Sequence, residues 1–76
     1  MKEHIAALLG AALPLVDLSS DYLYSELDSL GVTTILMLLS EEYHITLDAK
    51  DATPRNLRSL DSIVGMVKAK LAANES

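Results

Sequence analysis

The chain has 76 residues, of which 50% are hydrophobic and none is cysteine, and its formal net charge at pH 7 is −5. This length predicts a single small domain over residues 1–76, and the lack of cysteine excludes disulfide bonds and thiolate metal sites. The acidic charge disfavours nucleic acid as a partner, because binding to a phosphate backbone depends on clustered lysine and arginine.

The N-terminal stretch MKEHIAALLGAALPLV has two interpretations. A lysine ahead of an apolar run is typical of a cleaved secretory leader, but Glu3 and His4 interrupt the positive end and no small-residue cleavage site follows Val16. Apolar residues at helical spacing favour a structural helix over Lys2–Leu13, which Pro14 ends. The run is too short for a membrane span. We therefore expect a cytoplasmic protein without a membrane partner, and a secreted protein with a cleaved leader is the alternative.

The next part of the chain predicts a long loop and a second helix. Residues 14–27 show no clean period, so we expect a loop that buries some of its own leucines. The candidates are Leu15, Leu18 and Leu23. Asp28 is a good N-cap for a helix that ends near Tyr43. Its inward stripe should contain Ile35, Leu38, Leu39 and Tyr43. Met37 lies off this stripe and should be exposed.

The remaining residues predict an extended segment and two further helices. The alternating pattern HITLDA should bury Ile45 and Leu47. Thr53 and Pro54 suit the N-cap and first position of a short third helix that carries Leu57 inward. Ser59 suits the N-cap of a last helix. This helix should fray at AANES. Its buried stripe should contain Leu60, Ile63, Val64, Val67 and Leu71. The expected fold is all-α: a small four-helix bundle of three main helices and one short one.

No catalytic or metal-binding set can be recognised in the sequence. His4 and His44 lie far apart and lack metal-ligand spacing. No glycine-rich loop follows a strand, and the acids of residues 41–51 lack the calcium-loop pattern. We therefore predict that the chain is not an enzyme and has no metal site, and we interpret the acids as a solvated face.

An ordered set of motifs runs through the chain. Asp28, Ser29 and Leu30 form an Asp-Ser-Leu triplet at the start of a long helix, SEEY ends that helix, and the extended HITL follows. With the leading helix, the long first loop and a last helix that opens on a hydroxyl residue, this order resembles the acyl carrier protein family and its peptidyl and aminoacyl carrier domains. The resemblance extends over nearly the whole chain and implies the four-helix fold of that family.

The resemblance also implies a function. Ser29 matches the serine that bears 4′-phosphopantetheine, derived from coenzyme A, through a phosphodiester, and the thiol of this group carries acyl or aminoacyl cargo as thioesters between enzymes. Asp28 matches the acid that helps to orient the serine and metal-bound coenzyme A, and Leu30 matches a leucine that anchors the helix start. A phosphodiester at this place would lie near free N–H groups and the positive end of the helix dipole.

The partners implied are a phosphopantetheinyl transferase and acyl-activating or acyl-transferring enzymes, which a monomeric carrier would visit in turn. A second triplet, LDSI, places Ser62 in the first turn of the last helix. It lacks the acid-acid-aromatic ending and the extended segment, so we favour Ser29 for attachment. The plainer interpretation of Ser29 is a helix-start residue beside a capping aspartate.

The chain departs from the family pattern on its second helix. Typical fatty-acid carriers bear outward acids there, whereas the matching positions here are Gly31, Thr34, Met37, Ser40 and Glu41. We therefore expect an apolar partner-binding surface centred on Leu36 and Met37, with Glu41 at its rim. Arg55 and Arg58 also make their segment unusually basic. These features favour a specialised carrier in lipid, secondary-metabolite or aminoacyl chemistry. A helical interaction module without a prosthetic group is the alternative.

Overall fold

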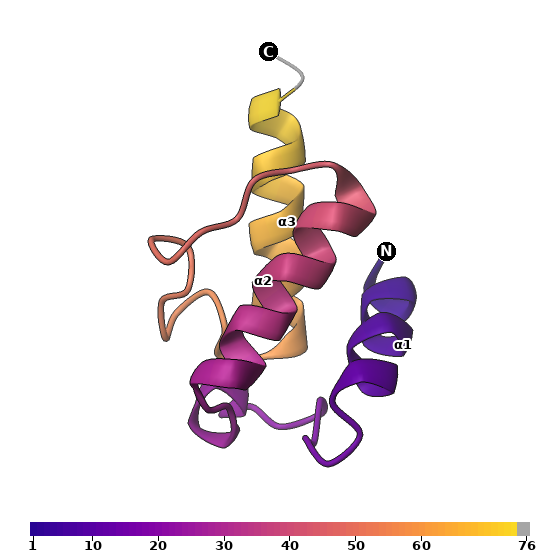
Figure 1. The fold of residues 1–76 in the computed structure, drawn as a ribbon, viewed down its shortest axis with the longest axis vertical. Helices are drawn as coiled ribbons and strands as arrows, with labels where there is room; N and C mark the ends of the chain where they lie inside the picture. The colour runs from indigo at the N-terminus through magenta and orange to yellow at the C-terminus, as the bar shows by residue number, and fades with distance from the viewer. Residues whose placement is uncertain (75–76) are drawn as a thin grey trace.

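The structure is a computed structural model that describes residues 1–74. Three α-helices and one 3-10 helix follow one another along the chain: α1 (Lys2–Ala12), η1 (Leu23–Glu26), α2 (Ser29–Tyr43) and α3 (Leu60–Asn74) (Figure 1). No strand occurs in this part of the chain, and the predicted all-α class is confirmed. None of these helices is long and apolar enough to cross a membrane.

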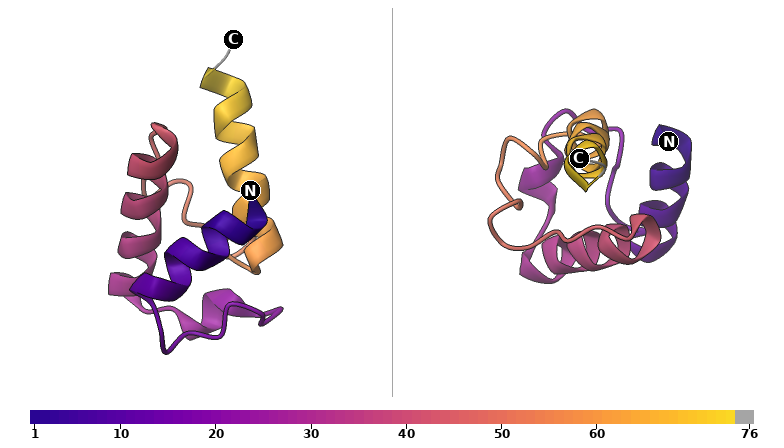
Figure 2. Two further views of the ribbon diagram at one scale, coloured as in Figure 1. Left: turned by 90° about the vertical axis from the view of Figure 1, so that its right-hand side faces the viewer. Right: turned by 90° about the horizontal axis from the view of Figure 1, so that it is seen from above.

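The helices surround one common core. In Figure 1 α2 and α3 run in the same direction, α1 runs in the opposite direction, and the segment 44–59 returns the chain along the bundle. α1 contacts both α2 and α3, which also contact each other, and Figure 2 shows the three helices from two further sides. This arrangement places the start of α2 at one end of the bundle, beside η1 and the long first loop.

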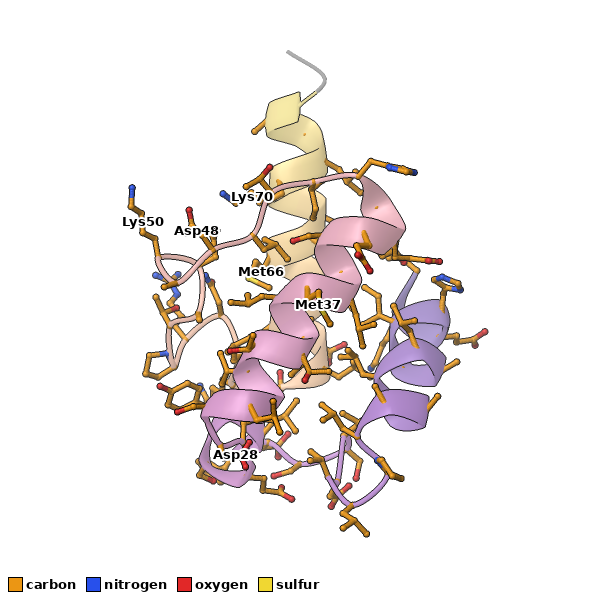
Figure 3. All side chains as sticks on the ribbon, viewed as in Figure 1. Asp28, Met37, Asp48, Lys50, Met66 and Lys70 are labelled. Atoms are coloured by element: carbon orange, nitrogen blue, oxygen red, sulfur yellow. The ribbon has the colours of Figure 1, made fainter. Side chains whose placement is uncertain are left out.

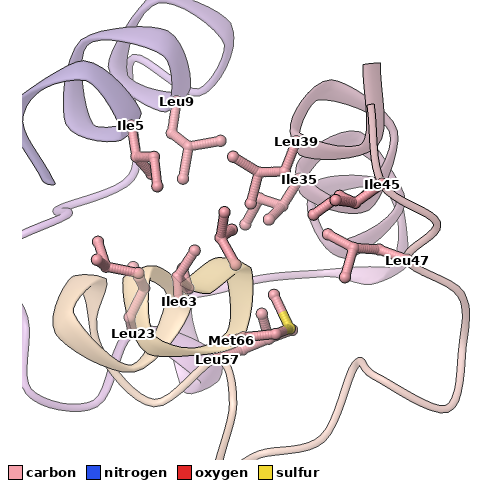
Figure 4. Close-up of a cluster of buried hydrophobic side chains, with 12 residues drawn as sticks. Ile5, Leu9, Leu23, Ile35, Leu39, Ile45, Leu47, Leu57, Ile63 and Met66 are labelled. Carbon is pink, nitrogen blue, oxygen red and sulfur yellow. The ribbon is translucent and has the colours of Figure 1, made fainter. Parts of the chain in front are cut away.

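The core contains only apolar side chains. Twelve hydrophobic residues of the described chain are buried, and no polar or charged residue of that part is (Figure 4): Ile5, Leu9, Leu23, Ile35, Leu39, Ile45, Leu47, Leu57, Ile63, Val64, Met66 and Val67. Most of the predicted inward residues of the helices and of the alternating segment are buried. Four others predicted for the stripes are half-buried against the core: Leu38, Tyr43, Leu60 and Leu71. Burial of this kind stabilises a fold by roughly 25 cal/mol per Å² of apolar surface removed from water.

The expected core role of Leu15 is wrong. Leu15 is 98% exposed, whereas Leu18 is half-buried and Leu23 is fully buried. The backbone N–H of Val16 donates to the carbonyl oxygen of Leu13 at 3.1 Å, which closes a tight turn directly after α1. This turn directs Leu13 and Val16 toward the core and leaves Leu15 at its tip.

The short third helix expected from Pro54 is a single turn. The N–H of Leu57 donates to the carbonyl oxygen of Thr53 at 3.0 Å, and Thr53 Oγ1 accepts from the N–H of Asn56 at 3.1 Å. Thr53 therefore caps this turn as a helix N-cap would, and Leu57 is buried. Ser59 already caps α3, because its Oγ accepts from the N–H of Ser62 at 3.2 Å. The residues between these two caps are too few for a longer helix.

The ends of α2 are both defined by specific contacts. Asp28 is its N-cap, as predicted, so the helix itself begins at Ser29. His44 ends it in the left-handed conformation, with φ 54°, and donates its N–H to the carbonyl oxygen of Ser40. α3 ends at the same end of the bundle as α2 (Figure 1), and the expected fraying at AANES is wrong as far as Asn74, because the helix continues to that residue. Residues 75–76 lie outside the described part.

Candidate functional site

Ser29 is the first residue of α2, and its side chain is exposed. Within residues 1–74 its hydroxyl makes no hydrogen bond. The capping residue Asp28 holds the helix start, because its Oδ1 accepts from the N–H of Gly31 at 2.7 Å and its carbonyl oxygen accepts from the N–H of Val32 at 3.0 Å. Figure 3 shows Asp28 at the lower end of α2. The hydroxyl therefore projects into solvent from a fixed backbone.

The start of α2 is suited to an anion. The first N–H groups of an α-helix have no intrahelical partner, and the helix dipole adds positive charge there. Asp28 occupies the N–H groups of Gly31 and Val32 through its side chain and its carbonyl oxygen. The backbone N–H groups of Ser29 and Leu30 have no hydrogen-bond partner within the described residues. These two donors lie next to the Ser29 hydroxyl, where a phosphodiester would carry its charge.

Gly31 was expected on the outward face of α2, and this expectation is wrong. Gly31 is buried, and a Cβ at this position would lie 3.2 Å from Asp28 Oδ1 and 3.4 Å from a methyl carbon of Leu27. The missing side chain lets the capping carboxylate and Leu27 fold closely over the first turn. Gly31 thus supports the geometry that holds Ser29 and offers no surface to a partner.

Leu30 does not anchor the helix start, contrary to the expectation from the resemblance. Its side chain is 74% exposed. Leu27, which is half-buried against the core, lies at the corresponding inner position before the helix. Leu30 is therefore an apolar side chain held in water directly beside Ser29, which makes it a candidate contact for another protein.

An apolar groove of about 640 Å³ begins at Ser29. One wall comes from α2, through Val32, Thr33, Leu36 and Met37. The opposite wall comes from the returning segment, through Leu47, Ala49 and Ala52, and Tyr24 of η1 closes one side. Leu36 and Met37 therefore border a groove, with Leu36 half-buried and Met37 53% exposed. The contribution of Tyr24, Ala49 and Ala52 could not be found from the sequence, because no period or motif marks them.

The remaining members of the expected outward face divide into two groups. Glu41 and Met37 are exposed, and Figure 3 shows Met37 part-way up α2 from Asp28. Thr34 is half-buried and donates its hydroxyl to the carbonyl oxygen of Leu30 at 2.8 Å. Ser40 is half-buried too, and its Oγ accepts from the N–H of Leu47 at 3.1 Å. The expectation that Ser40 faces outward is therefore wrong: it fastens the returning segment to α2.

Ser62 differs from Ser29 although the local triplets are nearly the same. Ser62 is half-buried, and its hydroxyl lies 3.1 Å from the Oγ of Ser59. Ser29 has no hydroxyl neighbour of this kind, since the residue before its helix is the capping Asp28. The structure therefore leaves the Ser29 oxygen free and places the Ser62 oxygen in the cap of α3.

The histidines take part in no cluster of metal-ligand type. His4 contacts Glu42 through its Nε2, and its ring meets that of Tyr43 edge-on with 6.1 Å between centroids. His44 is exposed at the end of α2. Residues 1–74 contain no group of three histidines or acids that could hold a metal ion. The contact between His4 and Glu42 joins the start of α1 to the end of α2.

These features define a class of protein: a small helical bundle that presents a free serine hydroxyl at the capped start of its second helix, beside an apolar groove. The chain belongs to the family described as "phosphopantetheine attachment site", whose model matches residues 1–67. This family carries covalently attached 4′-phosphopantetheine. The exposed hydroxyl and the two free N–H donors fit the phosphate end of that group. No curated protein and no solved structure matched the chain.

Proposed function

We propose that the chain is an acyl or aminoacyl carrier protein in which Ser29 Oγ forms the phosphodiester with 4′-phosphopantetheine. The observation that carries this proposal is the exposed, unbonded hydroxyl of Ser29 at the N-terminus of α2, in a member of a phosphopantetheine family. When bound, the group supplies a thiol that holds cargo as a thioester. The chain itself has no cysteine, so its own role is to hold and present the arm, without catalysis.

The residues around Ser29 have distinct roles in this proposal. Asp28 fixes the first turn through its Oδ1, while its Oδ2 makes no hydrogen bond within residues 1–74 and stays accessible to a modifying enzyme. The N–H groups of Ser29 and Leu30 and the helix dipole stabilise the negative charge of the phosphodiester. Gly31 keeps the capping carboxylate close to the backbone.

The apolar groove supports the proposal as a path for the arm. It starts at Ser29 and continues between α2 and the segment 47–52, past Leu36 and Met37. An arm that lies along it is partly shielded from water. Aliphatic cargo would gain free energy from contact with these walls, at roughly 25 cal/mol per Å² of apolar surface buried.

The proposed partners are a phosphopantetheinyl transferase and the acyl-activating or acyl-transferring enzymes that load and unload the thiol. Leu30, Met37 and Glu41 are exposed on α2, so a partner that reaches Ser29 can contact them. Apolar contacts at the centre and a charge at the rim are common in protein interfaces. Such a surface suits a specialised carrier in lipid, secondary-metabolite or aminoacyl chemistry, whose partner enzymes recognise it through contacts with apolar side chains.

Modification of two serine variants tests the attachment site. The chain, Ser29→Ala and Ser62→Ala are each incubated with coenzyme A, Mg²⁺ and a promiscuous phosphopantetheinyl transferase, and the intact mass is measured. We expect the parent chain and Ser62→Ala to gain the mass of one phosphopantetheine and Ser29→Ala to gain none. Circular dichroism of Ser29→Ala should show the helix content of the parent. A gain in mass by Ser29→Ala, or no gain by the parent with several transferases, would contradict the proposal.

A further inference from the structure

A second hollow, of about 380 Å³, lies between η1 and the turn that follows Thr53. Its lining residues are Tyr22, Tyr24, Ser25, Pro54, Arg55 and Arg58. The two segments are joined by a backbone hydrogen bond of 2.7 Å, from the N–H of Leu23 to the carbonyl oxygen of Arg58. Ser25 adds two bonds to the carbonyl oxygen of Tyr22, from its hydroxyl at 2.7 Å and its N–H at 3.1 Å. The backbone that carries this hollow is therefore held in one arrangement.

The hollow concentrates positive charge on an acidic molecule. Arg55 and Arg58 are the two arginines of the chain, whose net charge is −5. Both are exposed, and neither forms an ion pair within residues 1–74. Of the lysines, Lys2 and Lys70 are paired with Asp61 and Asp51 at 2.8 and 3.2 Å. Lys50 and Lys68 form no ion pair within residues 1–74, but neither of them lines the hollow. Two guanidinium groups without an internal counter-ion can accept carboxylates from outside, and their planar fork suits this geometry.

The walls beside the arginines are aromatic and apolar. Tyr22 is 70% exposed, and Tyr24 and Pro54 are also exposed. Tyrosine and arginine are the residue types that contribute most often to binding energy at protein interfaces, where they combine apolar area with polar groups. The hollow thus combines two exposed guanidinium groups with exposed aromatic and apolar side chains.

Its open form favours a protein segment over a small molecule. A site for a small molecule encloses most of its ligand, whereas this hollow is built from exposed side chains on one surface. We propose that the hollow is a docking site for an acidic segment of a partner protein, in which carboxylates flank an apolar side chain. Tyr24 also lines the groove at Ser29, so a partner docked here stands next to that groove. The docking itself does not depend on the arm.

A titration followed by NMR tests this site on the full-length Ser29→Ala chain, labelled with ¹⁵N. The probe is a short capped peptide of alternating glutamate and leucine, and its counterpart has glutamine in place of each glutamate. We expect saturable shifts at residues 22–25 and 54–58 with the glutamate peptide. The affinity of the glutamine peptide should be lower by a factor of about ten or more, and added salt should weaken the complex with the glutamate peptide. Because Ser29 is absent from this chain, the result is independent of phosphopantetheine attachment.

A matched pair of double variants separates the site from general electrostatics. Arg55→Gln with Arg58→Gln removes two positive charges at the hollow, and Lys50→Gln with Lys68→Gln removes two elsewhere. The arginine variant should bind the glutamate peptide roughly tenfold more weakly, and the lysine variant should bind it like the parent. Equal weakening in both variants, shifts centred on other residues, equal binding of the two peptides, or no binding at all would each overturn the proposal.

Discussion

The exposure and hydrogen bonding of Ser29 and Ser62 differ because of a single neighbouring residue. Each serine follows Leu-Asp and precedes an aliphatic residue, and each lies in the first turn of a helix. The hydroxyl of Ser62 meets the Oγ of Ser59, the residue that caps α3. Asp28 caps α2 with its own carboxylate and leaves the Ser29 hydroxyl free. Only the Ser29 oxygen is therefore exposed and without a hydrogen bond within residues 1–74.

The capping role of Asp28 can be measured. Asp28→Ala removes the acceptor of the Gly31 N–H and should lower the free energy of unfolding by about 1 kcal/mol, because a helix donor loses its partner. For a chain of this size this corresponds to a fall in Tm of roughly 4–8 °C. Asp28→Asn keeps a side-chain acceptor and should cost less than half as much. Equal losses in urea unfolding for the two variants would contradict a cap that acts through this hydrogen bond.

At the scale of elements, the returning segment 44–59 was expected to be extended and then briefly helical, and polar contacts hold it in place. Ser40 accepts the N–H of Leu47, and Asn56 Nδ2 donates to the carbonyl oxygen of Asp51 at 2.9 Å. The carboxylate of Asp51 makes two contacts: it accepts from the N–H of Asp48 at 3.1 Å and pairs with Lys70 of α3 at 3.2 Å. These bonds position Leu47, Ala49 and Ala52 as the far wall of the groove at Ser29.

The contacts of Asp51 make this element sensitive to acid. The hydrogen bond from the Asp48 N–H, together with the Lys70 ammonium, holds the pKa of Asp51 below its ordinary value of 3.8, against the opposite effect of burial. A folded-state pKa below the unfolded one stabilises the fold above about pH 4, and this stabilisation is lost as the pH falls through the folded pKa. Asp51→Asn should therefore lower the free energy of unfolding at neutral pH.

The difference between Asp51→Asn and the parent should shrink toward about pH 2, where the parent carboxyl is protonated as well. Urea unfolding at a series of pH values measures it. Asp21→Asn is the matched control, because it removes an exposed carboxylate that makes no hydrogen bond within residues 1–74. A constant difference across the series for Asp51→Asn, or an equal response of Asp21→Asn, would show that the contacts of Asp51 do not stabilise the segment.

At the scale of the whole molecule, the core of aliphatic side chains stabilises the fold, and repulsion between acidic side chains on the surface destabilises it. The chain has 11 acidic residues against 6 lysines and arginines. Three acids meet a basic partner in the structure, namely Asp61, Glu42 and Asp51. Exposed pairs of this kind each contribute about 0–1 kcal/mol, so they offset little of the mutual repulsion of the other acids.

We therefore expect added salt, and divalent cations especially, to raise the Tm. Screening over a Debye length of about 10 Å or less weakens the repulsion between surface carboxylates in the folded chain, where they are closest together. Thermal unfolding from low to moderate NaCl, and then with MgCl₂ at matched ionic strength, measures the effect. A Tm that does not change with either salt would rule out clustered acidic repulsion as a cost of folding.

The helices, their main inward stripes and the capping role of Asp28 could be predicted from residue order alone. These features depend on local chemistry and on periods of a few residues, such as the spacing of Ile35 and Leu39 or the carboxylate beside the first turn of α2. The same local pattern marked Ser29 as the first exposed hydroxyl of a long helix. The triplet by itself fits both serines, and the motifs that follow it in the sequence favour Ser29. The structure adds a difference in surroundings, because only the Ser62 hydroxyl contacts Ser59.

The groove, the hollow with Arg55 and Arg58, and the positions of Gly31, Leu15 and Leu30 came from the folded chain. The groove and the hollow depend on segments that are distant in sequence, as Leu23 and Arg58 are when they meet through one backbone hydrogen bond. Leu15 and Gly31 depend on close packing of chain neighbours, in the turn after α1 and at the first turn of α2. Helical period places a residue on a face, but the packing of Leu27 over the first turn of α2 determines which face is covered there. Burial is a property of neighbours in space, and a one-dimensional pattern contains only the neighbours along the chain.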